Sequence, residues 1–400
     1  MRIAHLADLH LGSRQYHRQN PNGINQREAD VANAFRAAVD GVLREQPDAV
    51  IVAGDLFHAV RPTNQAIVFA FKQFQRLREG LPEAPIILIA GNHDTPRSSE
   101  TGSILKLFEE LGLDVAADRE RRLVYPRLGL SVLAVPHEAL MSADRPALRP
   151  EGEELFQVLV LHGEVEGLFP ADRSSFEYGG AHLRPDEYAA DGWTYVALGH
   201  YHVQTRVRDR VWYSGSLEYV SSNPWGELAE EKARGRADGG AHGKGWLLAD
   251  LRTGRVEPKP VTLARKVFDL PPIDAAGLAA AEVDRLIAER VAAVTGGIAD
   301  QVARLVVRNI PRHVARELDH TAIREVKAAA LHFQLDLRRP EAPERETGVG
   351  SPGRRATLPE LVAEYLGRRP LPAELDRDAF VRTGRALVEQ AERAFAEEEG

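Results

Sequence analysis

Seven short apolar runs recur between residues 2 and 216, and each ends in polar residues. They are RIAHLAD (2–8), AVIVAGD (49–55), IILIAGNHD (86–94), LSVLAVPH (130–137), VLVLHG (158–163), YVALGH (195–200) and VWYSGS (211–216). Runs of this length bounded by turn residues are typical of buried β-strands. Apolar residues at helical spacing lie between the early runs, at 26–46, 62–79 and 98–112. This alternation of strand and helix predicts an α/β fold.

The patterns after residue 262 predict a second, smaller domain. Strands are expected at 266–270, 302–310 and 331–337, and helices at 274–294 and 313–330, which together make an α+β domain over 263–340. Residues 341–357 have the composition of a linker, and 358–400 carry two helical patterns that predict a hairpin. Within the first domain (1–262), the charged and Gly-rich stretch 226–245 is interpreted as an exposed loop.

The amino-acid composition limits the class of protein to which this chain can belong and the kind of metal site that it can form. At 400 residues with 44% hydrophobic and 28% charged residues, the chain is typical of a soluble globular protein of two or three domains. No apolar stretch approaches the roughly 18 residues that span a membrane. There is no cysteine, so any metal must be held by nitrogen and oxygen ligands, and a cytoplasmic location is expected. The net charge of −8 argues against a nucleic-acid coat protein, but not against a nuclease with bound cations.

The polar residues at the strand ends have the chemistry of metal ligands. They are Asp8, His10, Asp55, His58, Asn92, His93, Asp94, His162, His200 and His202. Packing histidines would be scattered over strand faces, whereas these gather at strand ends beside glycines. In an Asp-x-His segment both side chains can reach one ion. A single carboxylate such as Asp55 can bridge two cations about 3.5–4 Å apart. We therefore expect a two-metal site at the carboxyl ends of the strands.

The order DxH, GDxxH, GNHD, H, GHxH resembles that of the calcineurin-like metallophosphoesterases, and within them the SbcD/Mre-type DNA repair exonucleases. The resemblance implies a β-sandwich flanked by helices, with a capping domain and a C-terminal helical hairpin. It implies that metal one is held by Asp8, His10, Asp55 and His202, and metal two by Asp55, Asn92, His162 and His200. Manganese is the metal that the family implies, although mixed nitrogen and oxygen ligands would also accept iron or zinc.

The resemblance also implies roles for three residues outside the ligand set. His93 is expected over the scissile phosphate, with Asp94 orienting it, while water between the metals acts as the nucleophile. His58 distinguishes the nuclease branch of the family from the protein phosphatases, which carry GDxxDRG where this chain has GDLFHAV. The implied activity is a 3′-to-5′ exonuclease with endonuclease activity in DNA double-strand-break repair. A phosphodiesterase or phosphatase for small molecules such as cyclic nucleotides remains the alternative, and LHGEVEG (161–167) leaves a YhaO-like subgroup open.

Three surfaces are candidates for DNA or protein partners. The loop after the first motif offers Arg14, Tyr16, His17 and Arg18 to a DNA backbone, or is a solvated loop. Apolar stripes on the helices at 62–79 and 98–112 either pack on the sheet or form a homodimer interface of the kind seen in Mre-type proteins. The hairpin in 358–400 is expected to bind the coiled-coil base of an SbcC/Rad-type ATPase, as in the family.

Overall fold

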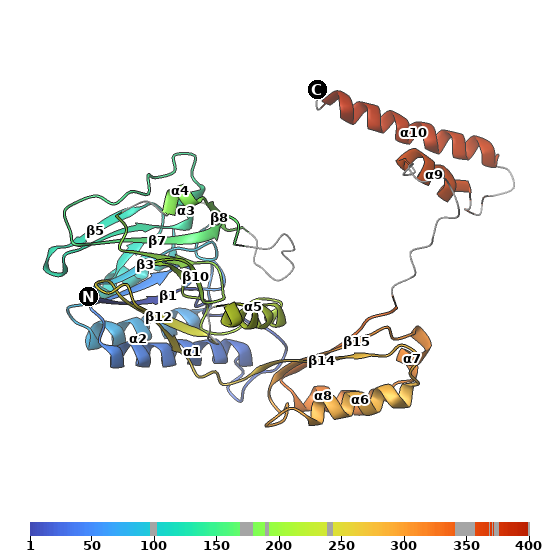
Figure 1. Ribbon diagram of the computed structural model, residues 1–400, viewed down its shortest axis with the longest axis horizontal. Coiled ribbons are helices and arrows are strands. Elements are labelled where there is room, and N and C mark those ends of the chain that lie inside the picture. The colour runs from blue at the N-terminus through green and yellow to red at the C-terminus, as the bar shows by residue number, and fades with distance from the viewer. Residues whose placement is uncertain are drawn as a thin grey trace. The chain divides into compact units, whose positions relative to one another are not determined.

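The computed structural model describes residues 1–96, 102–168, 179–188, 192–237, 243–340, 357–367, 369, 371 and 376–398. The chain divides into two compact units, Met1–Pro340 and Glu341–Gly400. In the second unit, helices α9 (Leu358–Gly367) and α10 (Arg377–Glu398) pack against each other (Figure 1). Within the described ranges, no helix is both long and apolar enough to cross a membrane.

Two mixed β-sheets form the core of the first unit. The six-stranded sheet has the order β13 (Val256–Pro260), β12 (Gly245–Asp250), β1 (Arg2–Leu6), β2 (Ala49–Ala53), β3 (Ile86–Ile89) and β4 (Asp114–Ala116). The second sheet has the order β10 (Thr205–Arg208), β11 (Val211–Tyr213), β9 (Tyr195–Gly199), β7 (Phe156–Val165), β6 (Leu130–Val135) and β5 (Arg121–Tyr125), with β8 (Ala181–Leu183) paired to β7. Strands β1 to β4 are parallel, as are β6, β7, β9 and β11. Their carboxyl ends therefore lie at one edge of each sheet.

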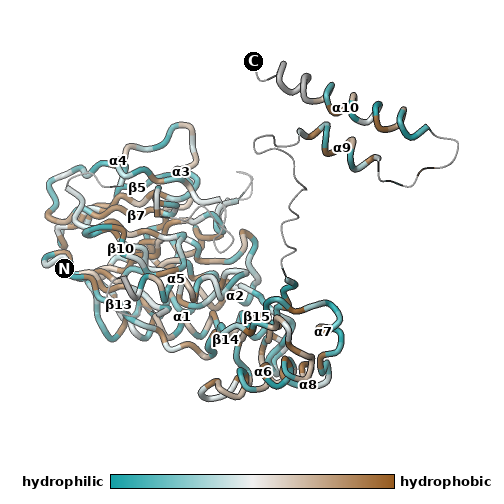
Figure 2. The backbone as a smooth tube through the Cα atoms, turned by 45° about the vertical axis from the view of Figure 1, so that its right-hand side comes forward, coloured by the Kyte–Doolittle hydropathy of each residue, from teal (hydrophilic) through white to brown (hydrophobic). Residues whose placement is uncertain are grey.

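Helices cover the outer face of each sheet, so that the strands are buried on both sides (Figure 1). Helices α1 (Gln26–Glu45) and α2 (Asn64–Gly80) and the 3₁₀-helix η2 (Ile104–Leu111) pack on the six-stranded sheet. The other sheet carries α3 (His137–Met141) and α4 (Pro185–Tyr188), and η3 (Pro126–Leu128) joins β5 to β6. Alternate strand residues such as Ile51 and Val158 point between the sheets. Because the other face of each strand is covered by helices, the strand sequences are nearly continuous apolar runs. Hydrophobic residues accordingly gather along strands such as β7 (Figure 2). The predicted sandwich flanked by helices is confirmed.

The chain from residue 263 to 340 forms a three-stranded parallel sheet with helices. Its strands are β14 (Val267–Asp274), β15 (Val302–Arg308) and β16 (His332–Leu337), and its helices are α6 (Ala280–Ala292), α7 (Arg312–Glu317) and α8 (His320–Ala329). The single helix predicted at 313–330 is two helices, because Asp319 accepts hydrogen bonds from the amides that begin α8. An apolar cluster that includes Trp225 and Val267 joins this sheet to the rest of the unit. The boundary of a separate capping domain at residue 263 stays a prediction.

Two further sequence predictions differ from the structure. The described parts of the stretch 226–245 are not an exposed loop: helix α5 spans Pro224–Ala237, and Glu227 and Lys244 are only 4% and 3% exposed, while residues 238–242 lie outside the described ranges. Their charges pair with each other at 2.5 Å, which a hydropathy pattern cannot reveal. Of the predicted helix 98–112, the described part is the short 3₁₀-helix η2, and residues 97–101 lie outside the described ranges.

Candidate metal centre

The predicted ligands lie at the carboxyl ends of five strands that belong to both sheets. Asp8 and His10 follow β1, Asp55 follows β2, Asn92 follows β3, His162 lies within β7, and His200 and His202 follow β9. The sheets meet face to face, with β2 packed against β7 and β9. Strand ends from the two sheets therefore converge, and the structure brings all seven side chains into one buried region.

The backbone leaves these strands in a strained conformation. Positive φ angles occur at Asp8 (54°), His10 (45°), Asp55 (51°) and His200 (97°). Each such non-glycine residue costs about 1–3 kcal/mol, and strain of this kind concentrates at functional sites. Hydrogen bonds from the Asp8 amide to the Gly54 carbonyl and from the His10 amide to the Asp55 carbonyl, both 3.0 Å, hold the turns together. The fold thus fixes the four side chains in place.

Two fully buried carboxylates each carry one oxygen that lacks a hydrogen bond. Asp8 Oδ1 accepts from the His200 amide at 2.8 Å, and Asp55 Oδ1 accepts from the His93 amide at 2.9 Å. Among the described residues, Asp8 Oδ2 has no hydrogen-bond partner, and Asp55 Oδ2 has only ion pairs, with His162 Nε2 at 3.3 Å and His10 Nε2 at 3.7 Å. A buried anionic oxygen without a partner is costly, and a divalent cation would supply the missing positive charge. The donor set therefore fits divalent cations.

Among the described residues, three groups of potential ligand atoms lie within 4.8 Å of one another, and two of them match the expected metal sites. The first of these two consists of Asp8, His10 and His202, and the second of Asp55, His162 and His200, while the remaining group is His10, His58 and His93. Asn92 belongs with the second group, because its Oδ1 lies 2.9 Å from His162 Nε2 and 3.1 Å from His200 Nδ1. Asp55 Oδ2 is 3.3 Å from His162 Nε2 and 3.7 Å from His10 Nε2. Asp55 therefore lies between the two groups, where a bridging ligand is required.

The charges of this region are strongly coupled. Burial raises the pKa of Asp8. At Asp55, burial is outweighed by the neighbouring His162 and His10, which hold the pKa well below its usual range. Burial lowers the pKa of His162, but the Asp55 and Asp8 carboxylates outweigh it and raise the pKa to about 9. Without cations His162 is therefore protonated at neutral pH, and cation binding would release that proton.

Two half-buried histidines lie beside the first group. His58 Nδ1 is 3.3 Å from His10 Nδ1, and the rings of His58 and His93 stack with centroids 5.3 Å apart. His93 Nδ1 is 2.8 Å from the His58 carbonyl oxygen, an arrangement in which the ring N–H donates to the carbonyl. This bond fixes the ring of His93 beside His10, with ring centroids 4.8 Å apart.

The sequence profile of calcineurin-like phosphoesterases matches residues 1–204, slightly more than half of the chain. The chain belongs to the calcineurin-like phosphoesterase family. This confirms the predicted family and identifies the chain as a metal-dependent phosphoesterase, whose chemistry requires the divalent ions that the two ligand groups fit.

Curated relatives of this phosphoesterase include archaeal repair proteins. It is 30% identical over 257 residues to the DNA double-strand break repair protein Mre11 of Saccharolobus solfataricus, an alignment that covers 63% of this chain and 60% of that protein. It is 27% identical over 270 residues to the protein of the same name from Methanocaldococcus jannaschii, covering 63% of each chain. The phosphoesterase thus spans about three fifths of the length of these relatives.

The expected role of Asp94 in this phosphoesterase needs correction. Its two carboxylate oxygens accept hydrogen bonds from the backbone amides of Leu56, Phe57 and Gly91 at 2.9–3.2 Å. The ring of His93, which Asp94 was expected to orient, is held through Nδ1 by the His58 carbonyl instead. Asp94 therefore fastens the turn after β3 to the turn after β2. It positions Asn92 and Asp55 rather than the ring of His93.

Three of the four predicted DNA-contacting residues make contacts within the chain. Arg14 Nε lies 2.7 Å from Glu28 Oε2, and Arg18 Nη1 lies 2.8 Å from Asp300 Oδ1. The ring of Tyr16 stacks on His332, with centroids 4.1 Å apart. His17 is exposed. In the structure Arg18 and Tyr16 of this loop brace the three-stranded sheet against the sandwich.

Two buried glutamates near the ligands were missed by the sequence analysis. Glu164 Oε1 lies 3.4 Å from His200 Nε2, and Glu227 Oε1 lies 3.4 Å from His202 Nδ1. Burial raises the pKa of Glu227, but Lys244 and His202 outweigh it and hold the pKa far below its usual range. Neither spacing nor hydropathy singles out these residues. The one signal near Glu164 is the segment LHGEVEG (161–167), which left a YhaO-like subgroup open.

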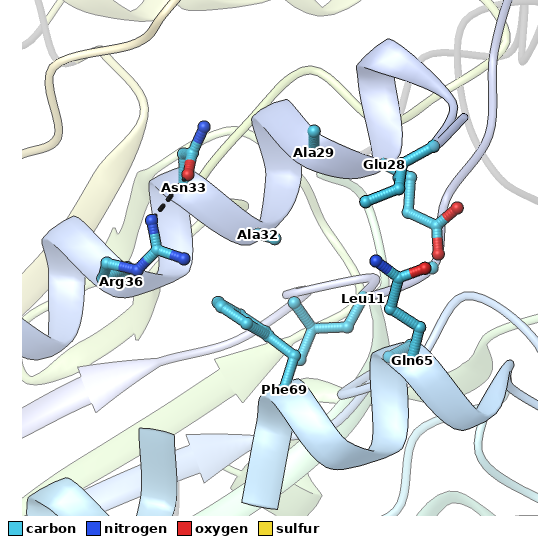
Figure 3. Close-up of a pocket in the computed structure, with 11 residues that line it drawn as sticks. Leu11, Glu28, Ala29, Ala32, Asn33, Arg36, Gln65 and Phe69 are labelled. Carbon is cyan, nitrogen blue, oxygen red and sulfur yellow. Dashed lines mark hydrogen bonds between the residues drawn. The ribbon is translucent and has the colours of Figure 1, made fainter. Parts of the chain in front are cut away.

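A pocket of about 160 Å³ lies between α1 and α2, apart from the ligand groups. Figure 3 shows Leu11 and Phe69 facing each other inside it, with Arg36 hydrogen-bonded to Asn33 on α1. Its lining is mostly apolar and contains no histidine or aspartate. The chemistry of the phosphoesterase therefore belongs to the strand ends rather than to this pocket.

Proposed function

We propose that this phosphoesterase is a manganese-dependent nuclease of DNA double-strand-break repair, a 3′-to-5′ exonuclease with endonuclease activity. The observation that carries the proposal is His58 beside His10 and His93 at the edge of a two-metal site. The similarity to two Mre11 repair proteins over 63% of the chain supports it. We further propose that the protein acts in the cytoplasm, in keeping with the lack of cysteine.

The residues of the site support hydrolysis of a phosphodiester. Two bound divalent cations would neutralise phosphate charge and activate a water molecule. His93, held through Nδ1, would direct Nε2 to the phosphate and, when protonated, donate to the oxygen that leaves. His58 both holds His93 by its carbonyl and stacks on its ring. Asp94 would keep the turns that carry Asn92 and Asp55 in register.

The test is release of nucleotides from linear duplex DNA by the full chain with Mn²⁺, beside the variant His93→Ala. Loss of a positioned acid typically lowers the rate 10²- to 10⁴-fold. An exposed histidine on α7, changed in His313→Ala, serves as the matched control and should leave the rate unchanged. The same samples are tested on bis-p-nitrophenyl phosphate. Hydrolysis of this small diester with intact DNA would show a working metal centre without the proposed substrate, and would point first to the missing ATPase partner and second to the small-molecule phosphodiesterase or phosphatase.

We propose a homodimer formed through α2 and η2. Phe74 and Phe108 from the two predicted stripes are fully buried in the core, as the packing interpretation requires. Ile67 and Phe71 are only half-buried, and Val68 is 51% exposed. These residues leave an apolar strip that a second copy could cover. Light scattering should give the mass of a dimer for the wild type and of a monomer for Val68→Glu, and a monomeric wild type would contradict the proposal.

We also propose that the hairpin α9–α10 binds an SbcC/Rad-type coiled-coil ATPase. Leu361, Tyr365 and Leu387 are 51%, 60% and 61% exposed, so the hairpin offers large apolar side chains that a partner could cover. Deletion of residues 346–400 should abolish co-purification with the ATPase while hydrolysis of the small diester continues. Unchanged association after the deletion would contradict the docking role.

We also propose that the loop after the first motif contacts the DNA backbone through Arg14, Tyr16, His17 and Arg18. Three of these residues, Arg14, Tyr16 and Arg18, also make contacts within the chain.

A further inference from the structure

The two histidines of the Gly-His-Tyr-His motif present opposite ring nitrogens to the ligand groups. His200 has Nδ1 3.1 Å from Asn92 Oδ1 and Nε2 3.4 Å from Glu164 Oε1. His202 has Nε2 3.0 Å from His10 Nε2 and Nδ1 3.4 Å from Glu227 Oε1. In each ring one nitrogen faces the ligands and the other faces a buried glutamate. In each ring, the nitrogen that faces away from the glutamate is therefore the one that can bind a cation.

Glu164 is held against His200 by close packing. It lies on β7, two residues after His162, and is only 3% exposed. A Cβ atom at Gly180 would lie 2.5 Å from His200 Nε2 and 2.7 Å from Glu164 Cγ, so the backbone at Gly180 closes over the pair and no larger residue fits there. His182, at 3.9 Å, is a second neighbour of the Glu164 carboxylate.

Glu227 is held against His202 by a network of hydrogen bonds. Its Oε1 accepts from the Ser221 amide at 2.9 Å, and its Oε2 pairs with Lys244 Nζ at 2.5 Å. Lys244 also donates to the His202 carbonyl oxygen at 2.8 Å and to Ser216 Oγ at 2.9 Å. One buried lysine therefore fixes both the backbone of His202 and the carboxylate behind its ring. A buried charge is tolerated where it is paired and hydrogen-bonded in this way.

We propose that Glu164 and Glu227 are positioning residues, which accept the N–H of His200 Nε2 and His202 Nδ1 and so direct His200 Nδ1 and His202 Nε2 toward the two metal sites. The inference rests on the metal-binding role of the two groups in the proposed function. A carboxylate behind a ligand histidine fixes its tautomer and ring orientation and raises its basicity. Because Glu164 contacts His200 and Glu227 contacts His202, each glutamate acts on the histidine of one ligand group.

The first experiment titrates Mn²⁺ alone into the full chain after removal of metals with EDTA. Glu164→Gln and Glu227→Gln should each weaken one of two binding steps by 10- to 100-fold, and the double variant should weaken both. The control is Glu231→Gln, because Glu231 contacts the same Lys244 at 3.5 Å from the same helix but bonds Tyr219 rather than a ligand histidine. A loss in Glu231→Gln as large as in Glu227→Gln would overturn the role of Glu227.

The second experiment reads the tautomers directly. In metal-free protein with ¹⁵N-labelled histidine at pH 8, His200 should be protonated at Nε2 and His202 at Nδ1, with signals assigned from their loss in His200→Asn and His202→Asn. The same tautomer at both residues would overturn the inference. Two Mn²⁺ bound by wild type and by both glutamine variants with equal affinity would also overturn it, whereas a wild type that binds no Mn²⁺ would overturn the proposed function. If Glu227→Gln does not fold, Glu164→Gln decides, because Glu164 lies outside the Lys244 network.

Discussion

A buried histidine in β1 makes the stability of this phosphoesterase depend on pH. His5 is 0% exposed in the middle of the six-stranded sheet, and its Nδ1 lies 2.9 Å from the Tyr195 hydroxyl. Burial lowers the pKa of His5 from 6.5 to about 3, because the protonated ring would lose its hydration without gaining a countercharge. Since the folded-state pKa is lowered, the stability contributed by neutral His5 is complete above pH 6.5 and is lost as pH falls toward 3.

The size of the effect follows from the difference in pKa. Each pH unit between the two pKa values is worth about 1.36 kcal/mol. Between pH 7 and pH 5 the free energy of unfolding should therefore fall by about 2 kcal/mol on account of His5 alone. The variant His5→Phe keeps an aromatic ring and removes the titration. It leaves the Tyr195 hydroxyl without its partner at a cost of about 1–3 kcal/mol, but that cost is the same at both pH values.

Urea unfolding followed by tryptophan fluorescence measures this difference. All four tryptophans lie within Met1–Pro340, so the signal reports on that unit. With EDTA present, we compare the free energy of unfolding of His5→Phe with that of wild type at each pH. The difference should shift in favour of the variant by about 2 kcal/mol when the pH is lowered from 7 to 5. His313→Phe, which replaces an exposed histidine, should show no such change. A difference between His5→Phe and wild type that stays constant within roughly 0.5 kcal/mol would refute the reasoning.

Three further substitutions test the architecture around the centre. Gly91→Ala would place a methyl group against the Asp55 carboxylate, so calorimetric titration should show Mn²⁺ affinity at least tenfold lower, whereas Gly243→Ala, which has open space around it, should bind normally. Lys244→Met would leave the Glu227 carboxylate buried without the lysine ammonium group that pairs with it, and should lower the free energy of urea unfolding by about 3–5 kcal/mol. A loss under roughly 1 kcal/mol would mean that the pair is not buried in solution. Phe74→Ala removes a fully buried ring packed edge-on against Phe108 and should cost about 3–5 kcal/mol in the same assay, while an unchanged midpoint would contradict the packing of α2 on the sheet.

Much of the fold and the ligand set could be predicted because the signals are local. An apolar run that ends at a glycine and a polar residue marks a buried strand and its carboxyl end, wherever the strand lies in the sheet. Parallel strands bring those ends to one edge, so Asp55 and Asn92 could be expected near each other before any coordinates were known. The same reasoning predicted helices at 26–46 and 62–79, which the structure has at 26–45 and 64–80.

Tertiary structure alone decided how the charged and polar groups pair. Glu227 and Lys244 lie in a stretch whose composition predicts exposure to solvent. They are nevertheless buried, because each neutralises the charge of the other behind His202. Asp94 follows His93 in sequence but bonds the amides of a different turn. Whether a polar side chain is exposed, paired or left with an unsatisfied oxygen depends on which distant atoms reach it, and those atoms come from other strands and helices. The sequence by itself determined which residues stand at the strand ends, and only the folded arrangement of two sheets decided which of them share a site and which glutamates lie behind them.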